Sequence, residues 1–263
     1  MSENKIDKEM PFIAHLEELR WHLIRSVIAI FVFFVIAFLS KDFIVGSILL
    51  APAKTNFVTY RMLCELSPTT CIDKLPFVIQ SRTMTGQFTM HLALSFVLAL
   101  IVAFPYTFWE IWRFVKPALY EKEQKITNGA TFVVSFLFMT GILFGYYLVA
   151  PLSINFLANY QLDPSIINEF DIVSYFSTLA MLVLGCGLMF QLPVAIFFLS
   201  KIGVVTPKIL SKFRKHAIVG ILVVAAIMTP STDIFTQILI AIPLTILYEL
   251  SIFVSAWAGK KGA

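Results

Sequence analysis

Long runs of uncharged residues alternate with short charged stretches along the chain. Asp, Glu, Lys and Arg are absent from 26–40, 83–109, 126–162, 172–200, 217–232 and 234–248. A transmembrane helix needs about 20 consecutive apolar residues. We therefore predict an all-α, polytopic membrane protein with one transmembrane domain over residues 1–263. Its six spans are expected near 22–40, 88–109, 128–150, 172–199, 216–229 and 234–251.

The basic residues fall mainly on one side of this predicted topology. Lys and Arg occupy the N-terminal segment, 109–127, 200–215 and the C-terminal tail, whereas 151–171 and 229–233 contain neither. The long 41–82 segment, with five of them, is the exception. Basic residues mark cytoplasmic loops, and long loops follow this rule less strictly. Because the number of spans is even, both termini are predicted to be cytoplasmic.

Two of the predicted spans are short. Their apolar stretches, 217–228 and 234–248, contain 12 and 15 residues. At a rise of about 1.5 Å per residue, they are about 18 and 22 Å long. Neither fills a hydrocarbon core of about 30 Å. Either the bilayer thins beside this pair, or the helices continue through Arg214 and Glu249, whose charged ends reach the interface.

Composition and motifs argue against enzymes and soluble binding proteins. The chain is 59% hydrophobic and 14% charged, with a mean hydropathy of +0.85, whereas a soluble domain carries about 25% charge. No phosphate-binding loop, H-E-x-x-H, C-x-x-C or G-x-S-x-G motif is present. The four histidines are scattered, and no carboxylate pair lies inside a predicted span. We expect no catalytic residues, no metal, no cofactor and no nucleic-acid binding.

An amphipathic segment precedes the first predicted span. Its apolar residues recur at helical spacing and form one stripe: Phe12, Leu16, Leu19 and Leu23. We expect this helix to lie at the membrane interface and to run into the first span. At 100° per residue, Glu18 lies on the same flank as His15 and His22, and Arg20 lies on the other flank. Spacing alone also fits a simpler interpretation, in which Glu18 is a solvated surface carboxylate.

Aromatic residues and prolines gather where the second predicted span returns to the cytoplasm. The cluster contains Phe104, Pro105, Tyr106, Phe108, Trp109, Trp112, Arg113, Phe114, Pro117, Tyr120 and Glu121. Glu123 opens the next predicted helix, where the helix dipole favours an acidic side chain. The Trp and Tyr residues also fit an ordinary interfacial belt. Composition by itself favours these structural interpretations.

Five motifs occur in order along nearly the whole chain. They are His15-Leu16-Glu17-Glu18-Leu19-Arg20; Phe104-Pro105 with Trp112, Phe114, Pro117, Leu119, Tyr120 and Glu123; Pro193-Val194-Ala195; Thr229-Pro230-Ser231-Thr232-Asp233 with Phe235 and Gln237; and Ala241-Ile242-Pro243. Together they resemble the TatC subunit family of the twin-arginine protein translocase. The resemblance implies six helices in a cupped, glove-like bundle with both termini in the cytoplasm.

The resemblance also implies a function and a location. It implies a receptor for the twin-arginine signal peptides of folded proteins in a bacterial inner membrane. TatA- and TatB-type single-span subunits, membrane lipid and further copies in a larger receptor complex are the implied partners. Export is then driven by the proton-motive force. An alternative, suggested by six helices and Gln191, is a proton-coupled small-solute transporter; it requires an ionisable group at the membrane midplane, where the sequence places none.

By resemblance, Glu18, Glu123, Arg20 and Phe114 form the signal-peptide-binding patch. Such a patch suits its ligand, because two guanidinium groups present planar forks of donors that match two carboxylates. Lysine does not reproduce this fork. Twin-lysine peptides are therefore expected to bind less tightly than twin-arginine peptides.

Several further positions carry weaker expectations. Gln191 stands where many family members have a glutamate, and we interpret it as a functional polar site facing the cup, because a purely structural amide would need its own partner. Pro52 and Pro117 are expected to be structural, and Asp233 is expected to be a helix N-cap. The outer-loop cysteines form a candidate disulfide, which sequence does not decide: Cys64 and Cys71. Cys186 is expected to be a small apolar packing residue.

Overall fold

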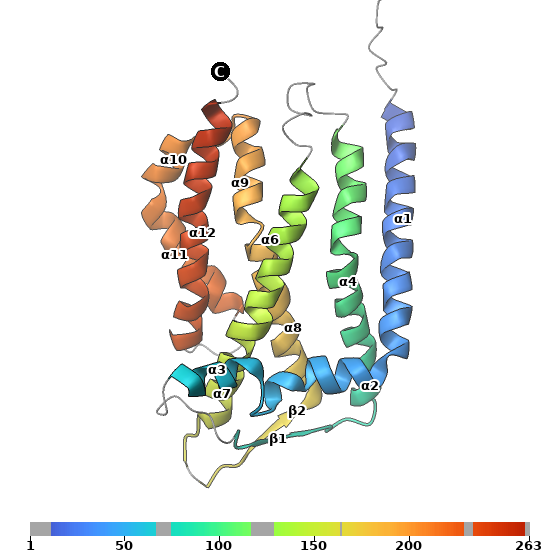
Figure 1. Ribbon diagram of the computed structural model, residues 1–263, viewed down its shortest axis with the longest axis vertical. Coiled ribbons are helices and arrows are strands. Elements are labelled where there is room, and N and C mark those ends of the chain that lie inside the picture. The colour runs from blue at the N-terminus through green and yellow to red at the C-terminus, as the bar shows by residue number, and fades with distance from the viewer. Residues whose placement is uncertain (1–11, 67–74, 117–128, 164, 229–233, 261–263) are drawn as a thin grey trace, which may run out of the picture.

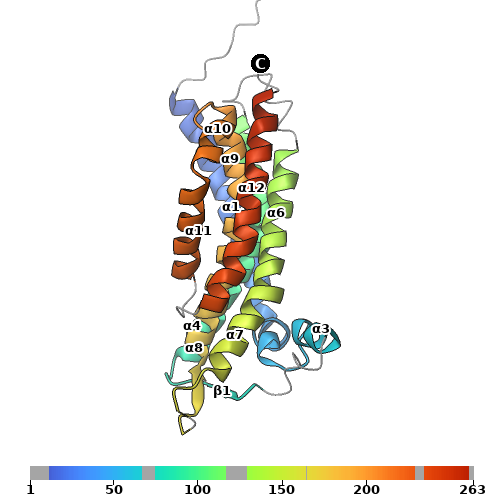
Figure 2. The ribbon, with the colours of Figure 1, turned by 90° about the vertical axis from the view of Figure 1, so that its left-hand side faces the viewer.

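Long helices that run roughly parallel form the body of the protein. The computed structural model describes residues 12–66, 75–116, 129–163, 165–228 and 234–260. The bundle is broad in one view and narrow in the other (Figures 1 and 2). Its principal helices are α1 (Phe12–Leu39), α4 (Gly86–Val115), α6 (Ala130–Phe144), α8 (Ile172–Met189), α9 (Leu192–Lys201), α11 (Arg214–Met228) and α12 (Ile234–Lys260). The end where α1 begins and α12 finishes is called the terminal end here (Figure 1).

Shorter elements gather at the opposite end, which we call the loop end (Figure 1). They are α2 (Lys41–Phe43), a π-helical turn (Ile44–Leu49), a 3-10 turn (Ala51–Ala53), α3 (Val58–Leu66) and α7 (Ala150–Asn159). Two short strands, β1 (Phe77–Gln80) and β2 (Asn168–Asp171), pair in parallel with Phe77 opposite Asn168. The all-helical prediction therefore needs one addition, a small sheet. Among the described short elements, α10 (Pro207–Lys212) lies instead at the terminal end (Figure 1).

Five helical stretches of the described chain are long and apolar enough to cross a membrane. They are Glu17–Leu39, Gly86–Val115, Ala130–Asn159, Ile172–Lys201 and Thr236–Trp257. The sixth predicted span, 216–229, corresponds to α11, which has 15 residues. The count of six spans therefore stays a prediction. The multi-pass helical architecture itself is confirmed.

The two spans predicted to be short differ from each other. α12 runs for 27 residues through Glu249 to Lys260, so this helix follows the second alternative and is not short. α11 begins at Arg214, whose guanidinium Nη2 lies 2.9 Å from the Glu249 carboxylate Oε2. At a rise of about 1.5 Å per residue, α11 is only about 22 Å long. Thinning of the bilayer remains a prediction for α11 alone.

Three helices differ in form from the prediction. α1 is one unbroken helix from Phe12 that continues in the line of the span (Figure 1), so its first turns do not lie flat at an interface. The third span extends to Asn159 through a π-helical turn, Gly145–Val149. The fourth span is interrupted at Phe190 and Gln191, between α8 and α9, and Pro193 is the second residue of α9. Proline lacks an N–H and is favoured in the first turn of a helix, which explains why α9 begins there.

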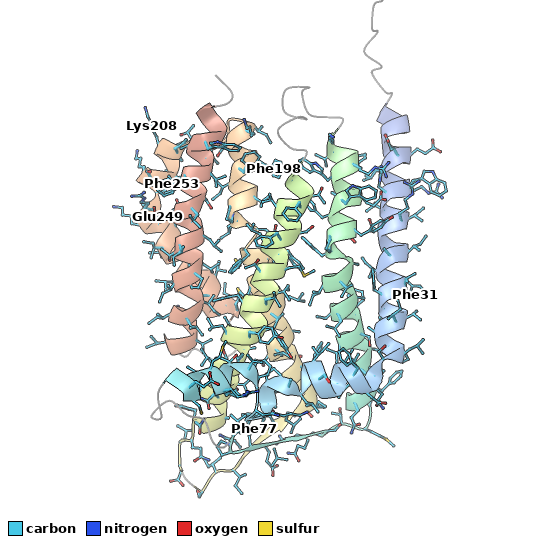
Figure 3. The ribbon with its side chains drawn as sticks, in the orientation of Figure 1. Phe31, Phe77, Phe198, Lys208, Glu249 and Phe253 are labelled. Carbon is cyan, nitrogen blue, oxygen red and sulfur yellow. The ribbon has the colours of Figure 1, made fainter. Side chains whose placement is uncertain are left out.

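The interior contains two apolar clusters, and large side chains also cover the outside. One cluster joins α4, α6 and α8 with the turn at Ile44–Leu49, and the other joins α8, α11 and α12. Where α6 meets α8, a Cβ on Gly141 would lie 2.7 Å from the Cys186 carbonyl oxygen. Glycine therefore permits this close approach. Phe31 is exposed on the side of α1 away from α4 (Figure 3), as expected for a surface that faces lipid.

Candidate functional site

Three of the predicted signal-peptide residues lie at the terminal end, on α1 and α4. Glu18 is half-buried and Arg20 is exposed, in agreement with their expected positions on different faces of α1. Phe114, near the end of α4, is half-buried, and its ring centroid lies 6.3 Å from that of His22 on α1. The structure thus brings Phe114 to the α1 face that carries Glu18 and His22. Glu123 and Pro117 lie outside the described residues.

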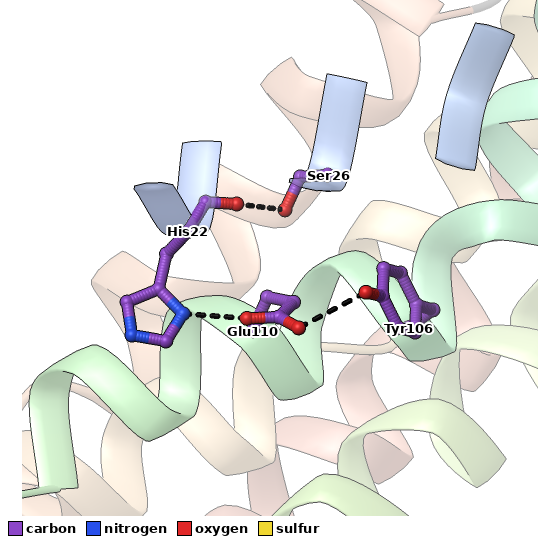
Figure 4. A network of polar contacts seen from close by, with 4 residues as sticks. All are labelled: His22, Ser26, Tyr106 and Glu110. Carbon is purple, nitrogen blue, oxygen red and sulfur yellow. Dashed lines mark hydrogen bonds and ion pairs between the residues drawn. The ribbon is translucent and has the colours of Figure 1, made fainter. Parts of the chain in front are cut away.

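A polar network with a buried centre joins α1 to α4 just below these residues (Figure 4). The Nδ1–H of His22 donates to the Glu110 carboxylate Oε2 at 2.5 Å, and the Tyr106 hydroxyl donates to the other carboxylate oxygen at 3.0 Å. Glu110 is 1% exposed and His22 is 7% exposed. The hydroxyl of Ser26 donates to the His22 carbonyl oxygen at 2.9 Å. This arrangement meets the rule that buried charges need partners.

The sequence interpretation missed this network for two reasons. It ended the second span at Trp109, so Glu110 was placed in a loop, whereas α4 continues to Val115. It also treated the histidines as scattered, although His22 and Glu110, 88 residues apart, meet across the helix contact. A weak signal was present, because Tyr106 and Glu110 are four residues apart and share one face of a helix. His22 likewise follows Glu18 by four residues.

A cavity of about 510 Å³ opens beside α4 at the same end, toward α6. Its lining combines aromatic, cationic and small polar side chains: Pro105, Trp109, Trp112, Arg113, Lys116, Thr131, Phe132 and Ser135. The Arg113 guanidinium lies 4.8 Å from the ring centroid of Trp109, a cation–π contact. Because two cations line this cavity, it is electrostatically unsuited to a pair of arginines. The surface of α1 around Glu18 and this cationic cavity therefore differ in their chemistry.

Gln191 lies at the break between α8 and α9. Its amide Nε2 donates to the Val134 carbonyl oxygen of α6 at 3.3 Å. Its amide oxygen is buried and has no hydrogen-bond partner among the described residues. The amide nitrogen therefore has the hydrogen-bond partner that a structural role requires. The functional role was expected because no such partner was foreseen, so this contact weakens that argument. The amide oxygen is unsatisfied, and the functional interpretation of Gln191 stays a prediction.

Pro52 lies buried at the loop end within a set of tyrosine–carbonyl hydrogen bonds. The hydroxyl of Tyr60 lies 2.8 Å from the Pro151 carbonyl oxygen and 3.1 Å from that of Pro52, so two acceptors share one O–H. Burial raises the pKa of Tyr60 above its ordinary value, and the neutral phenol is therefore the donor. Tyr146 and Tyr175 donate to the carbonyl oxygens of Ile48 and Leu49 at 2.8 and 3.0 Å.

The remaining predicted positions fall partly outside the described residues. Cys64 is disulfide-bonded, and Cys71, its predicted partner, lies outside the described residues. Cys186 is buried with a free thiol in the second apolar cluster. Asp233 also lies outside the described residues, and α12 begins at the next position, Ile234. No group of three or more His, Cys, Asp or Glu side chains in the described part of the chain is placed to hold a metal ion.

These features define a polytopic helical membrane protein whose polar groups concentrate at its two ends. Comparison with known proteins then identifies its family. Residues 14–243 match the family model described as Sec-independent protein translocase protein (TatC). The chain is 40% identical to the TatC protein of Blattabacterium sp. subsp. Periplaneta americana, over 96% of this chain and 97% of that one. It is 32% identical to the Escherichia coli TatC protein, over 98% and 92%.

Solved structures agree with these sequence relationships. A crystal structure described as the twin arginine translocase receptor TatC in DDM superposes with a TM-score of 0.71 at 33% identity, covering 92% of this chain and 99% of that one. A second crystal structure of a TatC receptor gives a TM-score of 0.68 at 31% identity, covering 93% and 99%. The chain belongs to the TatC family. It is a membrane component of a Tat protein translocase, a transport subunit and not an enzyme, as the sequence motifs indicated.

Proposed function

We propose that this protein is the signal-peptide receptor of its translocase. The observation that carries the proposal is the half-buried Glu18 carboxylate on α1, on the helix face where the Phe114 ring of α4 meets His22. A carboxylate beside an aromatic ring suits an arginine side chain, whose planar guanidinium forms charged hydrogen bonds and also stacks. Glu123, which follows α4 in the sequence, is proposed as the second carboxylate.

The energetics assign separate roles to the two parts of a signal peptide. A charged hydrogen bond contributes roughly 1.5–3 kcal/mol when partly shielded, but exposed ion pairs contribute only about 1 kcal/mol. The arginine pair therefore supplies selectivity, and the apolar part of the signal peptide supplies much of the affinity. We further propose that TatA- and TatB-type single-span subunits and further copies of this chain join the complex, and that the proton-motive force drives export.

The proposed orientation places the terminal end in the cytoplasm of a bacterium, in its inner membrane. It is supported by the excess of Lys and Arg in 109–127, 200–215 and the two terminal segments. The alternative function, a proton-coupled solute transporter, gains no support from Glu110. This carboxylate lies within the last two turns of α4 and is paired with His22. A coupling group would be expected at the membrane midplane, facing a cavity.

Peptide binding tests the proposal directly. The purified protein in detergent is titrated with a labelled twin-arginine signal peptide and with its twin-lysine counterpart, which shares the same apolar segment. We expect tighter binding of the twin-arginine peptide and a loss of this preference in Glu123→Gln. Equal binding of both peptides would contradict the assignment of the carboxylates. If neither peptide binds, repeating the titration with the TatA- or TatB-type partner present shows whether a second subunit completes the site.

A further inference from the structure

The contact between α1 and α4 carries an unusual polar feature. α1 packs mainly against α4 among the described elements, and much of its remaining surface is apolar and exposed. Near the loop end, Phe38 of α1 stacks on His91 of α4 at 4.4 Å between ring centroids. Near the terminal end, His22 and Glu110 form their buried hydrogen bond. The second contact is the one that lies beside the proposed signal-peptide residues.

The pair and the proposed patch occupy consecutive turns of the same two helices. Glu18 precedes His22 by four residues on α1, and Phe114 follows Glu110 by four residues on α4. Residues four apart in a helix lie on one face, one above the other. The pair therefore supports the patch from below, and the His22 ring also contacts the Phe114 ring.

Glu110 itself is too deeply buried to contact a peptide at this surface. It is 1% exposed, and its two carboxylate oxygens accept from His22 and Tyr106 (Figure 4). Its influence on a ligand must therefore pass through the position of α1. In an apolar contact, a helix can rotate or slide with little loss of packing, whereas a buried polar pair fits one register only. Selective recognition needs its groups held within about 0.5 Å of their productive geometry.

We infer that His22 and Glu110 are positioning residues for signal-peptide recognition: their buried contact fixes the register of α1 on α4 and so sets the spacing of Glu18 and Phe114. This inference rests on the proposed receptor function. It assigns twin-arginine selectivity partly to two residues that the peptide does not touch. The hydrogen-bond geometry matters here, and the net charge of the pair does not.

Three variants separate position, charge and general stability. The double variant His22→Leu/Glu110→Met replaces the pair with apolar side chains of similar size, an exchange that folded proteins often tolerate. Glu110→Gln keeps an acceptor for His22 and a donor for the Tyr106 oxygen but removes the charge. Glu249→Gln is the matched control, because it removes another ion pair between two helices, Arg214–Glu249, on α11 and α12.

The measurement is the ratio of the dissociation constants for twin-lysine and twin-arginine peptides, with melting temperature recorded in parallel. We expect the double variant to lower this ratio roughly five- to tenfold, the equivalent of about one exposed charged contact, and Glu110→Gln and Glu249→Gln to leave it within about twofold of the wild type. A ratio unchanged in the double variant overturns the inference while the receptor function stands. An equal loss in Glu110→Gln also overturns it, because charge would then be responsible.

A second measurement needs no peptide. Spin labels placed at Trp21→Cys and Ile111→Cys, both exposed positions on α1 and α4, report the distance between the helices. The distance distribution is expected to broaden or shift in the double variant and to stay unchanged in Glu110→Gln. An unchanged distribution in the double variant overturns the inference even if peptide selectivity is absent from the wild type. A wild type without peptide selectivity would instead contradict the proposed function.

Discussion

The contact of α1 with α4 at the terminal end and the contacts of the irregular turns at the loop end use different chemistry. At the terminal end, α1 is joined to α4 by ionisable side chains, His22 and Glu110, with Tyr106 on the second carboxylate oxygen. At the loop end, tyrosine hydroxyls donate to backbone carbonyls, as Tyr60 does to Pro52 and Pro151. The first kind of contact sets the relation between two helix surfaces. The second satisfies backbone groups that irregular turns leave unpaired.

This difference agrees with the proposed receptor function, which assigns peptide binding to the terminal end. Neutral tyrosine–carbonyl bonds fix short, irregular segments and need no further ligand, so they contribute to stability. At the terminal end, the His22–Glu110 pair lies beside Glu18, which is half-buried, and Arg20, which is exposed. These two charged side chains remain available to a ligand. Substitutions at the loop end should therefore change stability, and those at the terminal end should change binding as well.

The largest effect is expected from breaking the buried pair on one side. His22→Leu leaves the Glu110 carboxylate buried without its imidazole partner, which costs about 3–5 kcal/mol for a buried ion pair. Thermal unfolding in detergent, followed by circular dichroism, should show a clear drop in melting temperature. The double variant His22→Leu/Glu110→Met should recover most of it. Equal losses in both variants would mean that the pair contributes by packing alone.

The loop end should respond to the loss of a single hydroxyl. Tyr60→Phe removes the donor shared by the carbonyls of Pro52 and Pro151, and leaving buried acceptors unpaired costs about 1–3 kcal/mol. The same unfolding assay should detect this loss, while signal-peptide affinity stays unchanged. Tyr160→Phe, at an exposed tyrosine, is the control. A change in peptide affinity in Tyr60→Phe would remove the distinction between the two ends.

Two adjacent glutamates on α1 provide a finer test of the binding end. Glu18 is half-buried on the face of His22, whereas Glu17 is exposed. Glu18→Gln should weaken binding of a twin-arginine peptide about fivefold, which corresponds to about 1 kcal/mol for an exposed charged contact. Glu17→Gln removes the same charge one position away and should leave affinity nearly unchanged. Similar losses in both, measured by fluorescence titration, would indicate a general electrostatic effect.

The smallest effect concerns acid stability at the loop end. The backbone N–H of Arg82 donates to the Asp171 carboxylate and lowers the pKa of Asp171, and this side chain also caps α8 through the N–H of Val173. Because the folded-state pKa lies below the unfolded value of about 3.9, this stabilisation is present above that value and is lost as the pH falls through the folded-state pKa.

Comparing the melting temperatures of Asp171→Asn and the wild type between about pH 3 and 7 tests the direction of this pH dependence. The difference in melting temperature should be constant near neutrality and shrink as the pH falls below the unfolded pKa. A difference that grows on acidification would contradict the assignment of Asp171 as an ionised cap.

Much of the fold was available from local patterns in the sequence. Uncharged runs located the long helices, because hydropathy depends only on neighbouring residues. Ordered motifs such as the one ending in Arg20 indicated the family, which the comparisons confirm. Boundaries were less accurate: the second span was expected to end at Trp109, whereas α4 passes Glu110, whose buried carboxylate is paired with His22.

The sequence by itself determined that this chain crosses a membrane as helices, where its charged segments lie and which family it resembles. Only the tertiary structure decided which polar groups meet. His22 and Glu110 are 88 residues apart, and their contact depends on how α1 is rotated against α4. The tyrosines of the loop end likewise find carbonyls on distant turns. Local periodicity fixes which face a residue occupies, but the packing of whole helices fixes what that face touches.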